Sequence, residues 1–194
     1  MKKLLVTLLF LTLGTAWGGA FEDGRAAFNR NDYATAVQMW RPLAEQGDAA
    51  IQTLMGAMYT EGKGVTQDHK EAVKWYRLAA EQGDAKAQFS IGVKYANGRG
   101  VLQDYKEAVK WYRLAAEQGL AAAQSNLGAM YDNGHGVLQD YVRAHMWYNL
   151  ASAAGGSEYG TTNRDIIAKK MTPNQIEKAQ EMAKACQARN FKGC

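Results

Sequence analysis

The sequence has few of the residues from which most catalytic and metal-binding sites are built, and little charge of one sign. Its 194 residues include 2 cysteines, 3 histidines and 2 prolines, and 23 basic against 19 acidic residues give a net charge of only +4. A protein that follows a phosphate backbone needs a concentrated basic stripe, so we expect no nucleic-acid partner. The 47% of hydrophobic residues can build a core and exclude disorder of the whole chain. Few prolines and 20 glycines predict helices separated by glycine turns.

A long hydrophobic run occurs only at the start of the chain. Two lysines precede an apolar run, Leu4–Leu13, and the small residues Gly18 and Ala20 follow it. This order is typical of a secretory signal peptide over residues 1–20, cleaved after Ala20 or, alternatively, after Gly18. An uncleaved anchor is the other interpretation, but spanning a bilayer takes about 20 apolar residues. We therefore expect a mature protein without a transmembrane anchor, in the periplasm or fully secreted.

Both cysteines lie at the C-terminal end of the chain. In an oxidising compartment, Cys186 and Cys194 most simply form one disulfide that ties down the end of the last helix. A redox or metal-binding pair is the alternative, but the spacing is not C-x-x-C and no histidine lies nearby. The cysteines therefore predict a structural bridge.

The middle of the chain repeats with a period of 36 residues. Asp48–Gly83 and Asp84–Gly119 align without a gap and are identical at 24 of 36 positions. A third unit follows in the same register, so three repeats are expected over 48–155. Among the positions that recur in all three units are a glycine, a tyrosine and a tryptophan, namely Gly56/Gly92/Gly128, Tyr59/Tyr95/Tyr131 and Trp75/Trp111/Trp147.

Each unit predicts two antiparallel helices. The first is expected over Ala85–Asn97 with Asp84 as N-cap, and the second over Tyr105–Gln118 with Asp104 as N-cap. Gly92 has no side chain, so it permits close approach of the neighbouring helix. One hairpin cannot bury both of its faces, so neighbours must stack into an all-α solenoid.

The two ends depart from the repeat, as caps should. Residues 21–47 predict a first hairpin whose turn lacks the glycine insert of the later units. Residues 156–194 predict a C-terminal capping helix that starts after Thr172, with Pro173 at its first position and Gln175 completing a capping box.

The repeat unit resembles the Sel-1-like repeat, a relative of the tetratricopeptide repeat. The resemblance covers 48–155 strongly and 21–47 as a tetratricopeptide-like leader. In one unit, the residues that carry it are Ala87, Ile91, Gly92, Tyr95, Gly98, Gly100, Val101, Asp104, Tyr105, Ala108, Trp111, Tyr112, Ala115, Ala116 and Gly119. It implies a right-handed α-solenoid that acts as a monomeric adaptor for a protein or peptide partner, without a cofactor.

The resemblance also suggests where a partner binds. By analogy with the tetratricopeptide superhelix, the first helix of each unit lines the concave face. That face would mix small side chains, an exposed phenylalanine and amide or acid groups: Thr53, Ala57, Thr60, Glu61, Lys86, Phe89, Val93, Asn97, Ser125, Ala129, Asp132 and Asn133. Small residues leave room for a partner's backbone, and the amides can hydrogen-bond an extended peptide.

The repeated aromatic residues favour packing over ligand binding. Tyr76, Tyr112 and Tyr148 match the large aromatic inside the tetratricopeptide hairpin. The tryptophan one residue before each of them is expected to bridge adjacent repeats.

No catalytic pattern is evident in the sequence. The histidines His69, His135 and His145 are single variants of repeat positions and predict no metal site, and no serine motif of a hydrolase occurs. We therefore expect an exported, non-enzymatic adaptor or scaffold in the bacterial envelope. The alternative is an envelope enzyme that binds or hydrolyses β-lactams or peptidoglycan fragments, an activity linked to some cysteine-rich family members. A secreted effector that meets host proteins is a third hypothesis.

Overall fold

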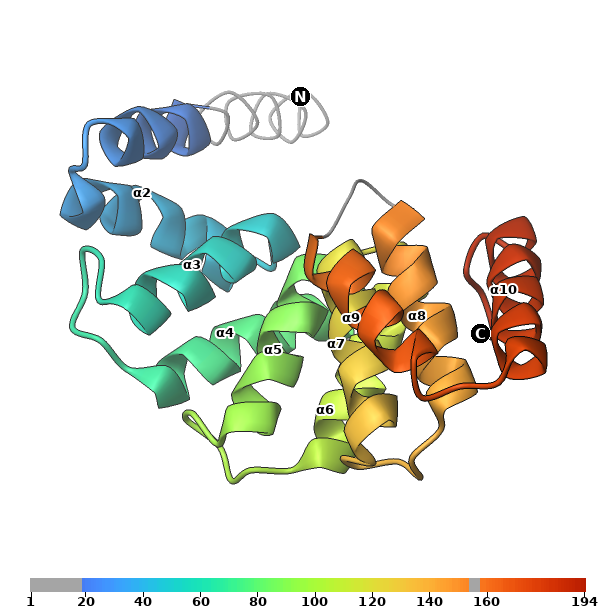
Figure 1. Ribbon diagram of the computed structural model, residues 1–194. Helices are drawn as coiled ribbons and strands as arrows, with labels where there is room; N and C mark the ends of the chain where they lie inside the picture. The colour runs from blue at the N-terminus through green and yellow to red at the C-terminus, as the bar shows by residue number, and fades with distance from the viewer. Residues whose placement is uncertain (1–18, 154–157) are drawn as a thin grey trace, which may run out of the picture. The chain divides into compact units, whose positions relative to one another are not determined.

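The computed structural model describes residues 19–153 and 158–194, and every regular element in these two ranges is an α-helix. The chain divides into two compact units, one ending at Gln82 and the other beginning at Gly83. After a helical segment over residues 19–29, the first unit contains α2 (Tyr33–Glu45), α3 (Ala49–Glu61) and α4 (His69–Glu81) (Figure 1). The second contains α5 (Ala85–Asn97), α6 (Tyr105–Ala116), α7 (Ala121–Asn133), α8 (Tyr141–Ala153), α9 (Glu158–Ala168) and α10 (Pro173–Ala188).

Aspartate side chains start most of the repeat helices, as predicted. Asp84 accepts a hydrogen bond from the Ala87 N–H at 2.7 Å, and Asp104 accepts from the Lys106 and Glu107 N–H groups at 2.8 and 3.1 Å. These bonds satisfy donors that the first helical turn leaves without a partner. The prediction of α5 is confirmed to the residue, and α6 ends two residues before the predicted Gln118.

The turn between the two helices of a hairpin depends on glycine for a steric reason. Gly136 has a φ of +72°, and a β-carbon there would clash with the Tyr105 backbone carbonyl. Residues with a side chain rarely adopt this φ. Both the backbone conformation and the clash therefore require glycine at this position.

Within each hairpin, a helical glycine lies against an aromatic ring. A β-carbon on Gly92 would lie 2.7 Å from the Tyr112 ring, and one on Gly128 would lie 2.8 Å from the Tyr148 ring. Both tyrosines are buried. The predicted close approach at glycine is therefore confirmed, and the tyrosines lie in the core.

Each unit has its own hydrophobic cluster. In the first unit, Trp75 of α4 joins the same cluster as Ala44 of α2 and Ile51 of α3, so this tryptophan bridges neighbouring hairpins as predicted. In the second unit, Trp147 of α8 is completely buried and lies in one cluster with Leu127 of α7.

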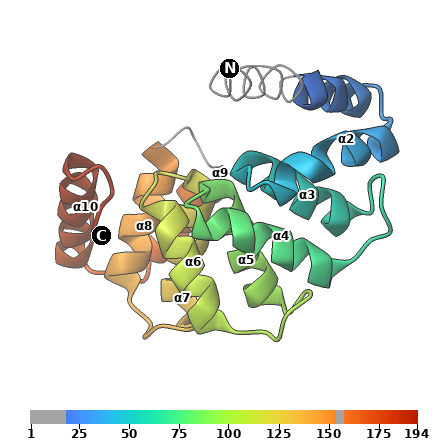
Figure 2. The same ribbon diagram turned by 180° about the vertical axis from the view of Figure 1, so that it is seen from behind.

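The C-terminal segment covers one side of the last hairpin. Figures 1 and 2 both show α10 beside α8, and Ala179, Ala183 and Cys186 of α10 are buried in the cluster of the second unit. The predicted capping box is confirmed: Thr172 N–H donates to Gln175 Oε1 at 2.8 Å. The sequence analysis missed α9, which packs on α8 and α7.

The predicted terminal bridge is present, because Cys186 and Cys194 are joined by a disulfide. The predicted signal peptide lies almost entirely in residues 1–18, outside the described residues, and stays a prediction. Among the described helices, none has the length and apolar character that crossing a membrane requires.

Candidate functional site

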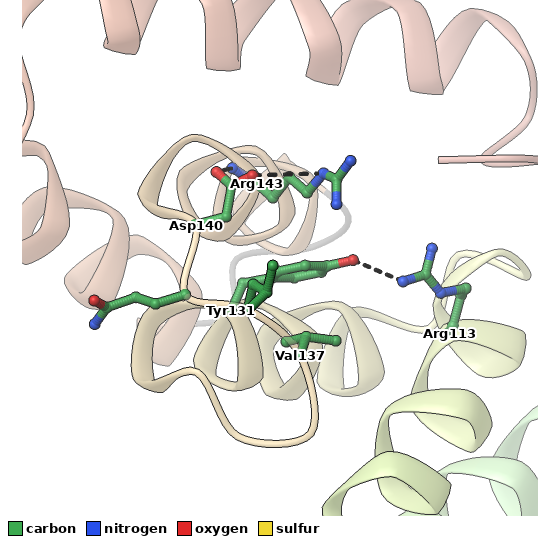
Figure 3. Close-up of a pocket in the computed structure, with 7 residues that line it drawn as sticks. Arg113, Tyr131, Val137, Asp140 and Arg143 are labelled. Atoms are coloured by element: carbon green, nitrogen blue, oxygen red, sulfur yellow. Dashed lines mark hydrogen bonds and ion pairs between the residues drawn. The ribbon is translucent and has the colours of Figure 1, made fainter.

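A cavity of about 460 Å³ opens where three helices of the second unit meet. Its lining comes from α6, from α7, from the α7–α8 turn and from the start of α8: Arg113, Tyr131, Val137, Leu138, Gln139, Asp140 and Arg143 (Figure 3). The repeat itself brings these residues together, because the turn folds back over the C-terminal half of α7 and places its last residues beside the preceding α6.

The base of the cavity is a hydrogen-bonded pair from neighbouring helices. Arg113 Nη2 of α6 donates to the Tyr131 hydroxyl of α7 at 2.7 Å. Tyr131 is only 3% exposed, so its ring belongs to the core while its hydroxyl lines the cavity. Burial fixes the ring, and the hydrogen bond holds the Arg113 guanidinium at its hydroxyl end (Figure 3).

A second guanidinium lies over the same ring. The Arg143 Cζ atom is 5.6 Å from the Tyr131 ring centroid, within the range of a cation–π contact. In Figure 3 the ring lies between Arg143 and Val137. Two cationic side chains therefore share one aromatic residue.

The one carboxylate in the cavity lining is Asp140, and it is already engaged. Its Oδ1 accepts from the Arg143 backbone N–H at 2.9 Å, and its Oδ2 lies 3.6 Å from Arg143 Nε. In the described part of the chain, Arg113 forms no ion pair with any carboxylate. The cavity thus has an excess positive charge at Arg113.

The sequence analysis did not single out Arg113 or Arg143. The available signal was the repeat register: Arg143 occupies the position that Glu71 and Glu107 hold in the two earlier units. A charge reversal at one repeat position marks a local change of chemistry, although it belongs to no recognisable motif.

In the first unit, the side chains predicted to face a partner are largely engaged within the unit. Thr53 Oγ1 donates to the Ala49 carbonyl at 3.0 Å and Thr60 Oγ1 to the Gly56 carbonyl at 2.8 Å. Glu61 forms an ion pair with Lys63 at 2.6 Å. Ala57 is half-buried on the same helix.

In the second unit, α5 keeps part of the predicted face accessible. Lys86 and Asn97 are exposed, and Phe89 and Val93 are half-buried. The sequence analysis expected Phe89 to be exposed, which is wrong: its ring packs against Tyr112 with centroids 5.9 Å apart. The helix therefore presents an apolar floor between two polar positions.

On α7 one predicted residue is inaccessible. Ser125 is 3% exposed and lies under Gly160 of α9, so its assignment to a partner-binding face is wrong. Asp132 is half-buried and pairs with Lys170 at 3.7 Å. Ala129 is half-buried, and the exposed Asn133 donates its side-chain N–H to the Ala129 carbonyl.

His145 is the buried histidine among the described residues. His145 is 3% exposed, and burial lowers its pKa, with Arg164 adding to the shift and Asp165 opposing it. Its Nδ1 has no hydrogen-bond partner among the described residues. In the same residues, no group of three His, Cys, Asp or Glu side chains is placed to hold a metal ion.

These features define a class of protein: an all-α solenoid of helix hairpins. A family model described as the Sel1 repeat matches residues 17–48, 50–84, 85–120 and 121–156. The first match includes the segment that the sequence analysis assigned to a leader hairpin. The chain belongs to the Sel1-repeat family.

Solved structures agree with this assignment. The chain is similar to c5321, a protective antigen of uropathogenic Escherichia coli strains with an SLR fold, at 40% identity and a TM-score of 0.75, covering 81% of this chain and 34% of that one. It is also similar to a Sel1 repeat protein from Oxalobacter formigenes, at 37% identity and a TM-score of 0.68, covering 72% and 57% of the two chains. This chain thus spans about a third and just over half of those proteins. No curated protein matches the sequence.

Proposed function

We propose that this chain is an exported, non-catalytic adaptor that binds a protein or peptide partner in the bacterial envelope or outside the cell. Membership of the Sel1-repeat family supports a protein-interaction scaffold in general. The disulfide between Cys186 and Cys194 and the predicted signal peptide support export. The proposal leaves the periplasm and full secretion as alternatives.

The observation that carries this proposal is the surface of α5 and α7 in the second unit. Phe89, Val93 and Ala129 are half-buried against the hydrophobic cluster of the unit. The exposed Lys86, Asn97 and Asn133 lie on the same two helices. An apolar floor with polar groups around it is the usual composition of a protein interface. We name these six residues the α5–α7 face.

We propose that the α5–α7 face is already ordered before a partner binds. Phe89 is held by Tyr112, and its helix α5 is capped by Asp84 at the start and by Gly98 at the end without a partner. Binding then orders little of the adaptor, which reduces the entropic cost of association. The predicted residues of the first unit, Thr53 to Glu61, are proposed as a separate contact surface for a partner.

The test is an in-cell crosslink and pull-down with the tagged full chain. The variant Lys86→Glu/Asn97→Lys/Asn133→Lys changes only exposed positions of the α5–α7 face, so the core stays intact. Lys106→Glu on α6, also exposed, is the matched control for a change of charge.

We expect a defined set of proteins captured by the wild type and by Lys106→Glu, and lost by the triple variant. Circular dichroism and melting temperature must show all three proteins folded. If the triple variant captures the same set, the α5–α7 face is not the binding surface. If the wild type captures nothing above an untagged strain, the adaptor role is wrong.

A further inference from the structure

The residues that line the cavity of the second unit differ from the equivalent residues of the first at two positions: Leu138 stands for Thr66, and Arg143 stands for Glu71. In the first unit, Arg41 Nη2 donates to the Tyr59 hydroxyl at 2.7 Å, the same pairing and distance as Arg113 and Tyr131. The hydrogen bond to Tyr59 is the largest cause that raises the pKa of Arg41, and the carboxylates of Glu45 and then Glu71 add to it, while burial opposes it. At the Glu71 position, the second unit has Arg143.

The first unit therefore has the Glu71 carboxylate near its arginine–tyrosine pair, at a position where the second unit has a second guanidinium. We propose that the cavity around Arg113, Tyr131 and Arg143 binds an acidic side chain of an extended partner peptide, with an aliphatic residue of the same peptide packing on Leu138. The partner's carboxylate would stand where the first unit has its own.

The donors needed for such a carboxylate are already in place. Arg113 uses one N–H on Tyr131, which leaves the rest of its five donors for a ligand. The Tyr131 hydroxyl accepts that bond, and its own hydrogen has no acceptor within the described residues. A carboxylate at the cavity mouth would receive an N–H from Arg113 and the O–H from Tyr131, while Arg143 would contribute charge and further donors.

Asp140 limits the anions that fit. It lines the same cavity and offsets part of the Arg143 charge, so the net charge of the lining is +1 rather than +2. A single carboxylate balances that charge, whereas a doubly charged phosphate would meet the Asp140 oxygens as well. Charge complementarity therefore favours an aspartate or glutamate side chain.

The apolar part of the proposal comes from two exposed leucines. Leu138 lines the cavity and is 91% exposed, and Leu102, at the same position one repeat earlier in the same unit, is also 91% exposed. Covering such exposed apolar side chains with a partner stabilises the complex, because it removes apolar surface from water. Leu102 lies outside the cavity lining, so the aliphatic contact is assigned to Leu138, beside the carboxylate position, which favours a peptide that continues past its acidic residue.

This inference rests on the proposed adaptor role but uses a different surface from the α5–α7 face. If the triple variant captured the same proteins as the wild type in the pull-down, the proposal for the cavity would be unaffected. The probe is therefore a synthetic peptide and not a captured protein. We choose acetyl-Gly-Glu-Leu-Glu-Leu-Gly-amide, whose carboxylates are all in side chains. In two comparison peptides, both glutamates are replaced by glutamine. One keeps the amidated C-terminus, and the other has a free C-terminal carboxylate.

The measurement is an NMR titration of the full chain that follows the arginine Nε–Hε signals and the leucine methyl signals. We expect the glutamate peptide to shift the signals of Arg113, Arg143 and Leu138 with a Kd of about 0.1 to 1 mM. The two glutamine peptides should bind at least about tenfold more weakly, because neither places a side-chain carboxylate on the guanidiniums.

Three variants make the result specific to the cavity. Arg143→Glu recreates the first unit's charge pattern at an exposed position and should weaken binding about tenfold or more. Arg113→Gln should do the same. Arg41→Gln alters the equivalent pair in the first unit and should leave the affinity unchanged.

Three results would each overturn the proposal. They are no shift of the Arg113, Arg143 and Leu138 signals, equal binding of the amidated glutamine peptide, and unchanged affinity in Arg143→Glu. Stronger binding of the free-carboxylate peptide would show that a chain terminus is the true ligand.

Discussion

The two units use the same arginine–tyrosine pair in opposite electrostatic surroundings. Arg41 and Tyr59 in the first unit, and Arg113 and Tyr131 in the second, form hydrogen bonds of 2.7 Å across neighbouring helices. The first pair lies near Glu71, and the second lies beneath Arg143, whose guanidinium carbon is 5.6 Å from the tyrosine ring. The backbone register sets the hydrogen bond, while one surface position sets the charge.

This difference separates what the repeat needs in order to fold from what it can use to bind. The glycine–aromatic contact and the aspartate caps occur in both units, because without them the hairpin loses packing or leaves backbone donors unpaired. The position of Glu71 and Arg143 carries no such requirement, since it lies at the surface. Function is expected at positions of this second kind.

The largest effect is expected where the two units are the same. Gly92→Leu in the second unit should lower the free energy of unfolding by about 1–3 kcal/mol, because the new side chain meets the buried Tyr112 ring. Gly56→Leu should lower it by a similar amount through the Tyr76 ring, which a β-carbon would approach to 2.6 Å. Urea denaturation measures both losses.

A matched control and a local readout show whether the two contacts are equivalent. Ala122→Leu adds a leucine at an exposed position of α7 and should change stability by less than about 0.5 kcal/mol. Hydrogen exchange should report lost protection in α5 and α6 for Gly92→Leu, and in α3 and α4 for Gly56→Leu. An unchanged unfolding midpoint in either glycine variant would contradict the close packing of that hairpin.

The next effect distinguishes the units by their response to acid. Burial and Arg164 hold the pKa of His145 below its ordinary value of 6.5. Above pH 6.5 the imidazole is neutral in both the folded and the unfolded chain. Below it, the unfolded chain takes up a proton that the folded chain resists, so stability falls as the pH falls, by at most about 1.4 kcal/mol per pH unit.

The variant His145→Val tests this response. The equivalent residue is Val73 in the first unit and Val109 in the second, and both are buried, so valine fits the repeat. We expect the variant to lose less stability than the wild type between pH 7 and 5.5, as measured by urea denaturation at each pH. Equal pH dependence of the two proteins would mean that His145 does not titrate differently in the folded state.

The sequence predicts the fold well because the decisive interactions are local. Asp84 and Ala87 are three residues apart, Thr172 and Gln175 likewise, and Gly92 recurs at a fixed spacing. Helix α9 was missed because Glu158–Ala168 lies outside the repeat, so its contacts with α8 have no counterpart in the sequence pattern.

The site is less predictable because its parts are distant along the chain. Arg113 and Tyr131 are 18 residues apart, and the cavity requires Arg143 from a third helix. The predicted face had two errors of the same origin: Ser125 is covered by Gly160 of the unpredicted α9, and Phe89 packs on Tyr112. A register analogy assigns a face to a helix, but it does not show which neighbours cover that face.

The smallest effect on stability, and the sharpest test of the comparison, is expected from exchanging the charges of the two units. Glu71→Arg gives the first unit the charge pattern of the second, and it should create a second site for the glutamate peptide at Arg41 and Tyr59. Because Glu71 and Arg143 lie near the surface, Arg143→Glu should change the free energy of unfolding by no more than about 0.5 kcal/mol. This change should shrink further in 1 M salt, where the Debye length is about 3 Å.

Peptide titration of the double variant Glu71→Arg/Arg143→Glu gives the decisive comparison. Binding that moves from the Arg113 signal to the Arg41 signal would show that this one position selects the ligand, whereas binding that stays at Arg113 would place the selectivity in Leu138 and the other residues of the cavity.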